Sequence, residues 1–256
     1  MKKKIYKALA ILCSCAFAVG AYQLISTYHN YSESDAMYNN IKDVLVSAND
    51  QGSIEINEPA QETNSVSTPI TVDFSELKAI NEDVVGWIYS EDTNINYPIL
   101  QGDDNLYYLY NAINGTSNRA GSIYMDAGNS SDFTDANTII YGHNLSNNSM
   151  FSSLDMYMSP QYFNDHRHVY ILTENKNYRI DIFSAYMTNP SSLTFTINFD
   201  SPEKYMDYLK YTWKSSDVKC SDVPMTEDDN IVTLATCSNM GNNVRYVVHG
   251  KLVELD

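Results

Sequence analysis

The chain has 256 residues, of which 43% are hydrophobic, and this content excludes an intrinsically disordered protein and provides for one sizeable core. Acidic residues outnumber basic residues by 32 to 16, so the formal net charge at pH 7 is −16. Such an acidic balance repels phosphates and excludes nucleic acid as a partner.

The N-terminal segment combines basic residues with a largely apolar stretch from about Ala8 to Ile25. The basic residues that precede this stretch are Lys2, Lys3, Lys4 and Lys7. A stretch of about 17 to 18 residues is at the short end of what spans a bilayer as a helix. The lysines predict a cytoplasmic N-terminus and an extracellular body. We therefore expect residues 1–30 to be a single-pass signal-anchor in the cell membrane.

Two alternatives remain for this segment. Ala16-Phe-Ala18 is similar to a signal-peptidase site, and cleavage there would release the mature protein. Leu12-Cys13-Ser14-Cys15 faintly resembles a lipobox. In all three cases the body of the protein works outside the cytoplasm.

Two of the four cysteines, Cys220 and Cys237, fall in the exported body. An even pair outside the cell is compatible with a structural disulfide. A domain of this size needs no disulfide to fold, however, and Cys237 lies in a motif that Cys220 does not share. We therefore favour two separate thiols.

Residues 31–72 connect the apolar segment to the rest of the chain. Tyr31 to about Ser47 has a helical pattern, with apolar residues on one side. Asn49 to Val72 is polar and irregular, which predicts a flexible spacer that holds the folded domain off the membrane.

The folded domain is expected at residues 73–256. Asp73 and Glu76 form a capping-box-like start of a helix. Ser201-Pro202 opens a second helix, whose inward stripe would be Tyr205, Leu209 and Trp213, with Tyr208 beside them. Short β-rich segments are predicted at 85–89, 95–100, 121–125, 138–144, 231–237 and 245–255, with a hairpin over 168–188 that turns at 175–177. Many short strands and few helices predict a mostly β fold with peripheral helices (α+β), built on a closed or nearly closed barrel.

Three chemically active side chains lie at the tips of predicted strands. The apolar run Ile231–Cys237 ends on a cysteine, the next run begins with Arg245, and an upstream run ends on His143. A thiol, an imidazole and a guanidinium are the parts of a cysteine acyl-transfer site. Taken singly, the same residues would more often be an inert buried cysteine, a turn histidine and a surface salt bridge.

Each of the three groups suits one step of acyl transfer. A thiol with a pKa near ~8.5 is only a few per cent thiolate at neutral pH, so Cys237 needs a neighbouring cation. The imidazole of His143 can act as cation and proton donor, and the guanidinium of Arg245 offers fixed donors to an oxyanion. His249 is a rival histidine, but four residues along one strand put it about 13 Å from Arg245, so both cannot reach one thiol.

These motifs resemble those of the sortases, and of class B sortases in particular. Thr233-Leu-Ala-Thr-Cys237 is similar to the sortase Thr-Leu-x-Thr-Cys motif, and Ile140-Tyr-Gly-His-Asn144 is similar to the histidine motif. The resemblance covers roughly Asp73 to Leu255. It implies a closed barrel of about eight strands with N-terminal helices, and catalytic roles for His143, Cys237 and Arg245.

The resemblance also implies a reaction and its partners. The enzyme would be a cysteine transpeptidase on the outer face of a Gram-positive cell. It would cut a C-terminal sorting signal similar to (N/S)PxTG between Thr and Gly, through a thioester intermediate. The partners implied are surface proteins that bear this signal, peptidoglycan or its lipid-linked precursor as the amine acceptor, and the cytoplasmic membrane.

Substrate contacts follow from the same resemblance. Asn105 and Leu109 match the Asn-x-x-x-Leu string that lines the sorting-signal groove in the family. Thr194 and Phe195 come from a loop, residues 187–199, that matches the family poorly.

Two further contacts, Ala235 and Thr236, lie inside the cysteine motif. Ala235 stands where class B enzymes often have Ser. We expect this departure to alter affinity or motif preference and to leave the chemistry intact.

No metal or other cofactor is expected, because acidic runs such as Glu227-Asp-Asp229 lack the spacing of an EF-hand loop. Two rival functions are weighed. A papain-like peptidase would place its Cys before its His, whereas His143 precedes Cys237. A wall- or ligand-binding module is favoured by the 21 tyrosines and the acidic surface, and it would be indifferent to the loss of Cys237.

Overall fold

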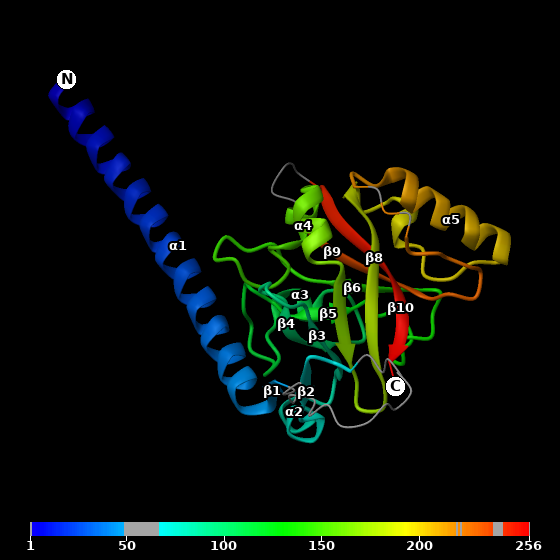
Figure 1. Ribbon diagram of the computed structural model, residues 1–256. Coiled ribbons are helices and arrows are strands. Elements are labelled where there is room, and N and C mark those ends of the chain that lie inside the picture. Colours follow the sequence, from blue (N-terminus) through cyan, green and yellow to red (C-terminus); the bar gives the residue numbers. More distant parts are fainter. Residues whose placement is uncertain (1, 49–66, 219, 221, 238–242, 256) are drawn as a thin grey trace.

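The chain folds around a closed barrel of eight strands (Figure 1). The computed structural model describes residues 2–48, 67–218, 220, 222–237 and 243–255. Around the barrel the strands follow the order β10-β8-β7-β3-β4-β5-β6-β9. The prediction of a mostly β fold with peripheral helices and a closed barrel of about eight strands is confirmed.

The barrel strands are rich in Val, Ile and Tyr, which pack well on a pleated surface. They are β3 (Val84–Tyr89), β4 (Asn96–Leu100), β5 (Ile123–Met125), β6 (Asn137–Tyr141), β7 (His168–Leu172), β8 (Asn177–Thr188), β9 (Ile231–Cys237) and β10 (Arg245–Leu255). In β6 and β9 nearly every described side chain is buried, because one face fills the barrel and the other lies under loops and helices.

Short helices cover the outside of the barrel. They are α2 (Phe74–Ile80), α3 (Tyr107–Tyr110), α4 (Pro160–Asp165) and α5 (Pro202–Ser215), with 3-10 turns η1 (Leu154–Met158) and η2 (Leu193–Phe195). Asp73 caps α2 by accepting a hydrogen bond from the Glu76 amide at 3.1 Å, as its pattern predicts. Ser201 caps α5 in the same way.

The predicted inward stripe of α5 is correct for Tyr205 and Leu209 and wrong for Trp213. Tyr205 and Leu209 are buried, whereas Trp213 is 41% exposed. The indole ring lies at the rim, where its Nε1–H donates to the carbonyl of Cys220 at 2.7 Å. Thr212 takes the buried position in its place.

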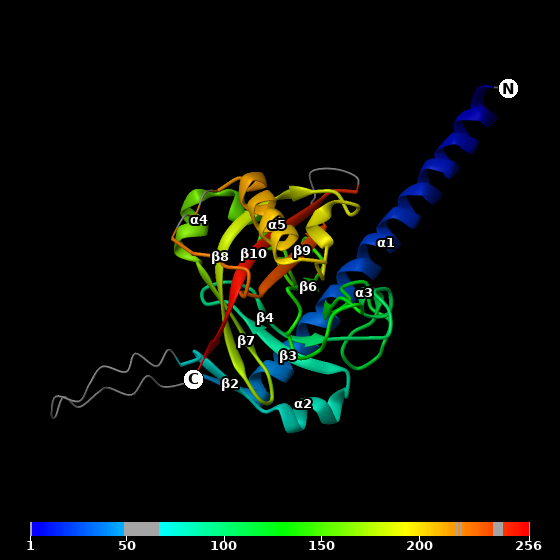
Figure 2. The same cartoon turned by 90° about the vertical axis from the view of Figure 1, so that its right-hand side faces the viewer.

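A single helix, α1 (Lys2–Leu45), joins the N-terminus to the barrel (Figures 1 and 2). The predicted membrane segment and the predicted helix after it are therefore continuous. Within the described part of the chain, α1 is the helix long and apolar enough to cross a membrane, and a signal sequence has the same features.

The C-terminal part of α1 packs directly on the barrel. Tyr38, Ile41 and Leu45 form an apolar stripe that belongs to the main core, and the Tyr38 hydroxyl lies 3.0 Å from Ser122 Oγ. Asn147 donates to Asp35 at 2.8 Å. The expected spacer is only partly visible, since residues 49–66 lie outside the described residues. The part that is described includes β2 (Ile70–Val72), which pairs with β1 (Val46–Ala48). The barrel is thus held against the helix and not apart from it.

Candidate active site

Three strands deliver His143, Cys237 and Arg245 to one end of the barrel. Strands β6 and β9 are parallel, with Tyr141 paired to Ala235, so His143 and Cys237, two positions further on, lie at the same end of the barrel. Strand β10 runs antiparallel to β9 and begins with Arg245 directly opposite Cys237. The side chain of Cys237 lies outside the described part of the structure, and the strand register places its backbone.

A pocket of about 270 Å³ opens at this end of the barrel. Its walls include seven of the predicted site residues: Asn105, Leu109, His143, Phe195, Ala235, Thr236 and Arg245. Tyr124, Tyr141, Gly142 and Pro190 complete the lining. Residues from β6, from the β9–β10 pair and from α3, which are far apart in the sequence, therefore line one cavity.

His143 is held by the backbone of α3. Its Nε2 lies 2.8 Å from the carbonyl oxygen of Leu109. Because a carbonyl can only accept, Nε2 carries the proton of this hydrogen bond. The Nδ1 atom is the ring nitrogen left for proton exchange in the pocket.

Arg245, the first residue of β10, is half-buried and lies in the pocket wall. In the described part of the chain, its guanidinium forms no ion pair with a carboxylate. Its charge is close enough to oppose the rise in the pKa of Tyr141. A permanently charged fork of donors in a cavity suits the binding of an oxyanion.

Asp126 ties together two residues of the pocket wall. Its Oδ2 accepts hydrogen bonds from Asn105 Nδ2 and from the Tyr141 hydroxyl, both at 2.9 Å. Burial, followed by the charge of Asp126, raises the pKa of Tyr141 well above its usual range, so this hydroxyl stays a donor. The Asn105 Oδ1 also accepts from the Ala127 amide at 2.7 Å, which fixes the orientation of the side-chain amide.

Asp126 and Tyr141 are site residues that the sequence did not single out. A carboxylate placed directly after the apolar strand β5 was a usable signal, because strand ends supply pocket residues. Its partners are 21 and 15 residues away along the chain, so only the folded chain reveals the network.

The predicted substrate contacts differ in how deeply their side chains are buried. Phe195 lines the pocket and stacks on Tyr141 with ring centroids 6.2 Å apart. Thr194 is fully buried and is not among the lining residues, and its Oγ1 lies 2.9 Å from the Tyr186 hydroxyl. Thr236 has a buried Oγ1 without a hydrogen-bond partner among the described residues.

His249, the rival histidine, is fully buried away from the pocket. Its Nδ1 lies 2.8 Å from Thr233 Oγ1, and its Nε2 lies 3.1 Å from the Tyr186 hydroxyl. Burial lowers the pKa of His249 to about 3, so the ring is neutral at neutral pH. A neutral imidazole with both nitrogens engaged has the role of a structural side chain.

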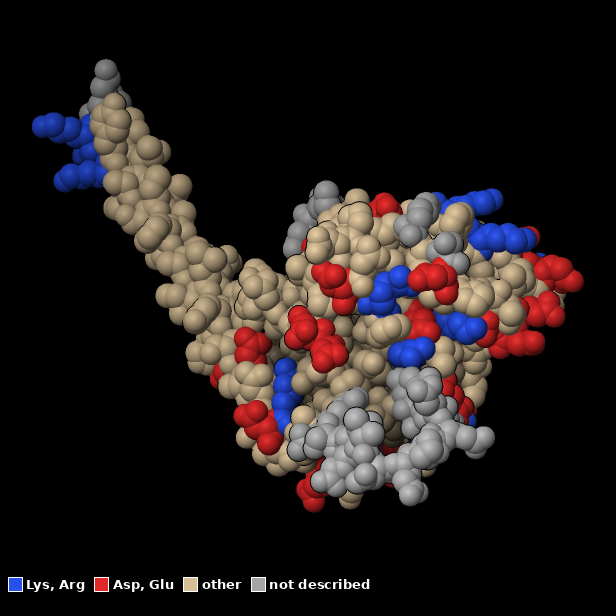
Figure 3. Space-filling view, in the orientation of Figure 1, with Lys and Arg blue, Asp and Glu red and all other residues tan. Residues whose placement is uncertain are grey.

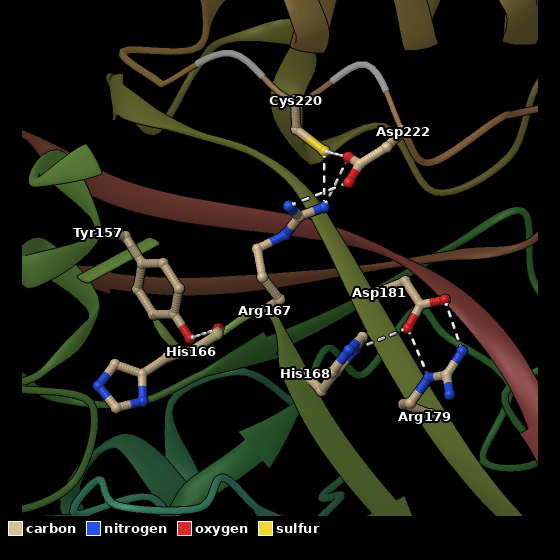
Figure 4. Close-up of polar contacts among 8 residues, drawn as sticks. All are labelled: Tyr157, His166, Arg167, His168, Arg179, Asp181, Cys220 and Asp222. Carbon is tan, nitrogen blue, oxygen red and sulfur yellow. Dashed lines mark hydrogen bonds and ion pairs between the residues drawn. The ribbon is translucent and has the colours of Figure 1, made fainter. Parts of the chain in front are cut away.

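Cys220, Arg167 and Arg179 belong to a group of polar residues separate from the pocket (Figure 4). Arg167 donates to Asp222 at 2.9 Å and to the Cys220 sulfur at 2.8 Å, and Cys220 is a free thiol. The Cys220 thiol also donates to Asp222 Oδ1 at 2.6 Å. Beside these residues, His168 and Arg179 are both bonded to Asp181. No member of this group lines the pocket.

The site holds no evident metal ligands, since the described residues contain no group of three His, Cys, Asp or Glu side chains able to bind a metal ion.

Comparison with known proteins identifies the family. The Sortase domain model matches residues 88–253, and sortase B of Listeria monocytogenes is 36% identical over 193 residues, 75% of this chain and 78% of that protein. The chain belongs to the sortase family. Sortase B of Staphylococcus aureus is 34% identical over 184 residues, which cover 71% of this chain and 75% of that protein.

Solved structures place this sortase in class B. Sortase B of Bacillus anthracis in complex with AAEK1 has a TM-score of 0.74 and 33% identity, covering 89% of this chain and 99% of that one. The Staphylococcus aureus sortase B–substrate complex has a TM-score of 0.68 and 34% identity, covering 72% and 85%. This sortase is a cell-wall sorting transpeptidase, whose substrates carry sorting signals and whose acceptor is a peptidoglycan-type amine.

Proposed function

We propose that this sortase cuts a signal resembling (N/S)PxTG between Thr and Gly, through a thioester on Cys237. The observation that carries the proposal is the convergence of β6, β9 and β10 on one pocket that contains His143 and Arg245. Cys220, by contrast, lines a different pocket, where no histidine or arginine is found among the described lining residues.

The first half-reaction forms the acyl-enzyme. The thiolate of Cys237 attacks the carbonyl carbon of the signal threonine, and the oxyanion that develops is stabilised by the guanidinium of Arg245. His143, as imidazolium, protonates the glycine nitrogen from Nδ1 while Leu109 holds Nε2. The C–N bond breaks, the glycine fragment leaves as an amine, and a thioester remains.

The second half-reaction transfers the acyl group. An amine of peptidoglycan or of its lipid-linked precursor attacks the thioester carbonyl, and neutral His143 accepts the proton that the amine loses. Arg245 again stabilises the oxyanion. The carbon–sulfur bond breaks, Cys237 is released, and a new amide joins the protein to the acceptor.

Asn105, Leu109, Ala235, Thr236 and Phe195 form the proposed binding wall for the signal, with Thr194 as its buried support. Thr236 belongs to this wall, although its Oγ1 is buried and has no hydrogen-bond partner among the described residues. Ala235 leaves space where a serine hydroxyl would lie, which favours an apolar contact at that point of the signal.

We propose further that α1 is the membrane anchor, with the lysines inside the cell and the barrel outside. The uncharged, largely exposed stretch of α1 from Leu9 to Ile25 (Figure 3) supports this topology, and so do the lysines that precede it. No cofactor takes part in the proposed reaction.

Cleavage of a sorting peptide tests the proposal. The full chain, purified in detergent, is incubated with a peptide that contains the signal, with and without an added amine. We expect cleavage between Thr and Gly and a new amide product when the amine is present. The Cys237→Ala variant should be inactive, and full activity in that variant would overturn the proposal. Products that ignore the added amine would instead favour a plain cysteine peptidase.

A further inference from the structure

Five buried, uncharged side chains are linked by hydrogen bonds to one another and to the segment around η2. They are Asn137 on β6, Tyr186 on β8, Thr233 on β9, His249 on β10 and Thr194 on η2 itself, and each is at most 2% exposed. We refer to these five residues as the η2 clamp. Alternation along β10 places His249 on the same face of the barrel wall as Arg245, which lines the pocket.

The segment around η2 depends on such side-chain contacts. Residues 189–201, all of which are described, contain no strand, so no β-ladder holds this part of the chain against the barrel. Buried side chains must therefore fix the position of η2.

The direction of each hydrogen bond can be assigned from the partners of one amide. Asn137 Nδ2 donates to the Thr196 carbonyl at 2.9 Å, so Oδ1 is the atom that accepts from the Thr233 hydroxyl at 2.7 Å. Because the Thr233 proton is used in that bond, the Thr233 oxygen accepts from His249 Nδ1, 2.8 Å away. The neutral ring of His249 thus carries its proton on Nδ1 and accepts at Nε2.

The same reasoning leads from His249 back to η2. The Tyr186 hydroxyl, 3.1 Å from His249 Nε2, donates to that nitrogen. The Tyr186 oxygen then accepts from the Thr194 hydroxyl at 2.9 Å, a closer contact than that of Thr194 with Thr188 Oγ1 at 3.5 Å. The bonds therefore begin at Thr194 and end at Thr196. Such a chain acts as a unit, because leaving one buried partner unsatisfied is costly.

The residue between the two ends of this chain is Phe195, which lines the pocket and stacks on Tyr141. Tyr186 packs with Ala235 and Val247 in a small apolar cluster, and Tyr141 and Phe195 lie against that cluster. Ala235 lines the pocket as well. Tyr186 consequently supports the pocket wall with its ring and holds η2 with its hydroxyl.

We propose that Tyr186 and His249 are positioning residues of the transpeptidase, which hold Phe195 where it binds the sorting signal. Both act through η2, and the inference rests on the role proposed above for Phe195. A turn that is in place for only part of the time lowers the apparent affinity for the signal in proportion. His143 is held separately, by the Leu109 carbonyl, so loosening η2 should affect binding more than the chemical step.

A matched pair of tyrosine variants tests the proposal. Tyr186→Phe removes the hydroxyl and keeps the ring, so it opens the η2 clamp at one atom. The control is Tyr157→Phe, which removes another buried hydroxyl, one that donates to the His166 carbonyl at 2.8 Å (Figure 4). Tyr157 is not among the described lining residues of the pocket. Each variant is made in the full chain in detergent, and cleavage of a sorting peptide and amide hydrogen exchange over residues 189–197 are measured.

We expect Tyr186→Phe to raise KM by about 5-fold, the effect of losing one buried hydrogen bond, with kcat changed by less than about 2-fold. Exchange over residues 189–197 should become faster, and Tyr157→Phe should match the parent chain in both measurements. The Tyr208 hydroxyl still donates to the Thr194 carbonyl at 2.8 Å in Tyr186→Phe, so η2 should loosen without unfolding. Thr194→Val removes the same hydrogen bond from its other end and should repeat the result if Tyr186→Phe disturbs the fold.

Four results would overturn the proposal. They are an unchanged KM with unchanged exchange in Tyr186→Phe, faster exchange with an unchanged KM, a fall in kcat without a rise in KM, and an equal rise of KM in Tyr157→Phe. The last result would mean that general destabilisation explains the effect. Failure of the parent chain to cleave the peptide would instead overturn the proposed function, and the exchange comparison would still report whether the clamp holds η2.

Discussion

At the level of single residues, the role proposed for Arg245 in binding the oxyanion requires more than a positive charge. Its guanidinium presents several donors in a fixed plane, whereas a lysine presents one compact charge. We predict that Arg245→Met lowers kcat for a sorting peptide by about 100-fold, the usual effect of removing an oxyanion donor. Arg245→Lys should recover only part of this loss. Steady-state kinetics measure both, and an unchanged kcat in Arg245→Met would show that the oxyanion is stabilised by other groups.

Asp126 positions the pocket wall without reaching the proposed scissile bond. Its carboxylate holds Asn105 and the Tyr141 hydroxyl at 2.9 Å each. Both bonds go to Oδ2, while Oδ1 accepts from the Gly128 amide at 2.8 Å. Asp126→Asn must therefore turn a donating NH2 group towards one of these two sets of donors, which disturbs the pocket wall. We predict a rise in KM for the sorting peptide with a smaller change in kcat. A fall in kcat with unchanged KM would instead place Asp126 in the chemical step.

His249 should make the stability of the fold depend on pH. Burial lowers its pKa to about 3, against about 6.5 in the unfolded chain. Between these values the unfolded state binds more protons, so the free energy of unfolding falls as the pH drops from about 6.5 towards 3. His249→Gln lacks this titration and loses hydrogen bonds worth about 1 kcal/mol each. Urea unfolding at pH 7 and pH 5 should show the variant and the parent becoming more alike at the lower pH. A constant difference would contradict the assignment.

The residues proposed for direct chemical roles could be singled out from the sequence, and their supporting partners could not. Cys237, His143 and Arg245 stand out because each terminates or begins a strand in a recognisable motif. The bond from His143 to the Leu109 carbonyl involves a backbone atom, and a backbone atom leaves no signature in the sequence. Thr194 was chosen from a poorly matched loop and is not among the lining residues of the pocket.

At the level of elements, the turn after β6 depends on a glycine for space. A Cβ added at Gly142 would meet Ile123 Cδ1 and, at 2.8 Å, the ring of Phe151. Gly142→Ala must therefore move the turn that delivers His143, at a cost of about 1 to 3 kcal/mol. We predict a lower melting temperature together with a loss of kcat. The matched control is Gly20→Ala, where the added Cβ meets no atom within 4 Å. Parental stability and kcat in Gly142→Ala would contradict this role for the turn.

The positions of the strands and of the capped helices could be predicted from local sequence patterns. Which side chains of each element are buried could not be predicted fully. β3 to β10 lie where β-branched and aromatic runs predict them, and α2 and α5 begin at their predicted caps. The error at Trp213 arises because helical spacing cannot distinguish a buried position from a rim position. Helix α3 has only one turn, so no periodic pattern marks it, although the Asp104 carboxylate accepts from the Leu106 and Tyr107 amides at its start.

At the level of the whole molecule, the barrel and α1 form one packed unit. The sequence predicts a spacer because residues 49–72 are polar. The structure attaches the barrel to the helix through Tyr38, Ile41 and Leu45, which lie before that segment. Long-range packing of this kind is set by the shape of the barrel surface, which a local pattern does not encode. The transpeptidase site is consequently held at a fixed place relative to the helix.

Trapping the acyl-enzyme is the most direct test of the proposed chemistry. The intact full chain is mixed with a sorting peptide in the absence of an amine acceptor and weighed by mass spectrometry. We predict an added mass equal to the peptide up to its threonine, located on Cys237 and removed by hydroxylamine. Cys220→Ser should keep this adduct and Cys237→Ala should lose it. An adduct that persists in Cys237→Ala would contradict the proposed nucleophile.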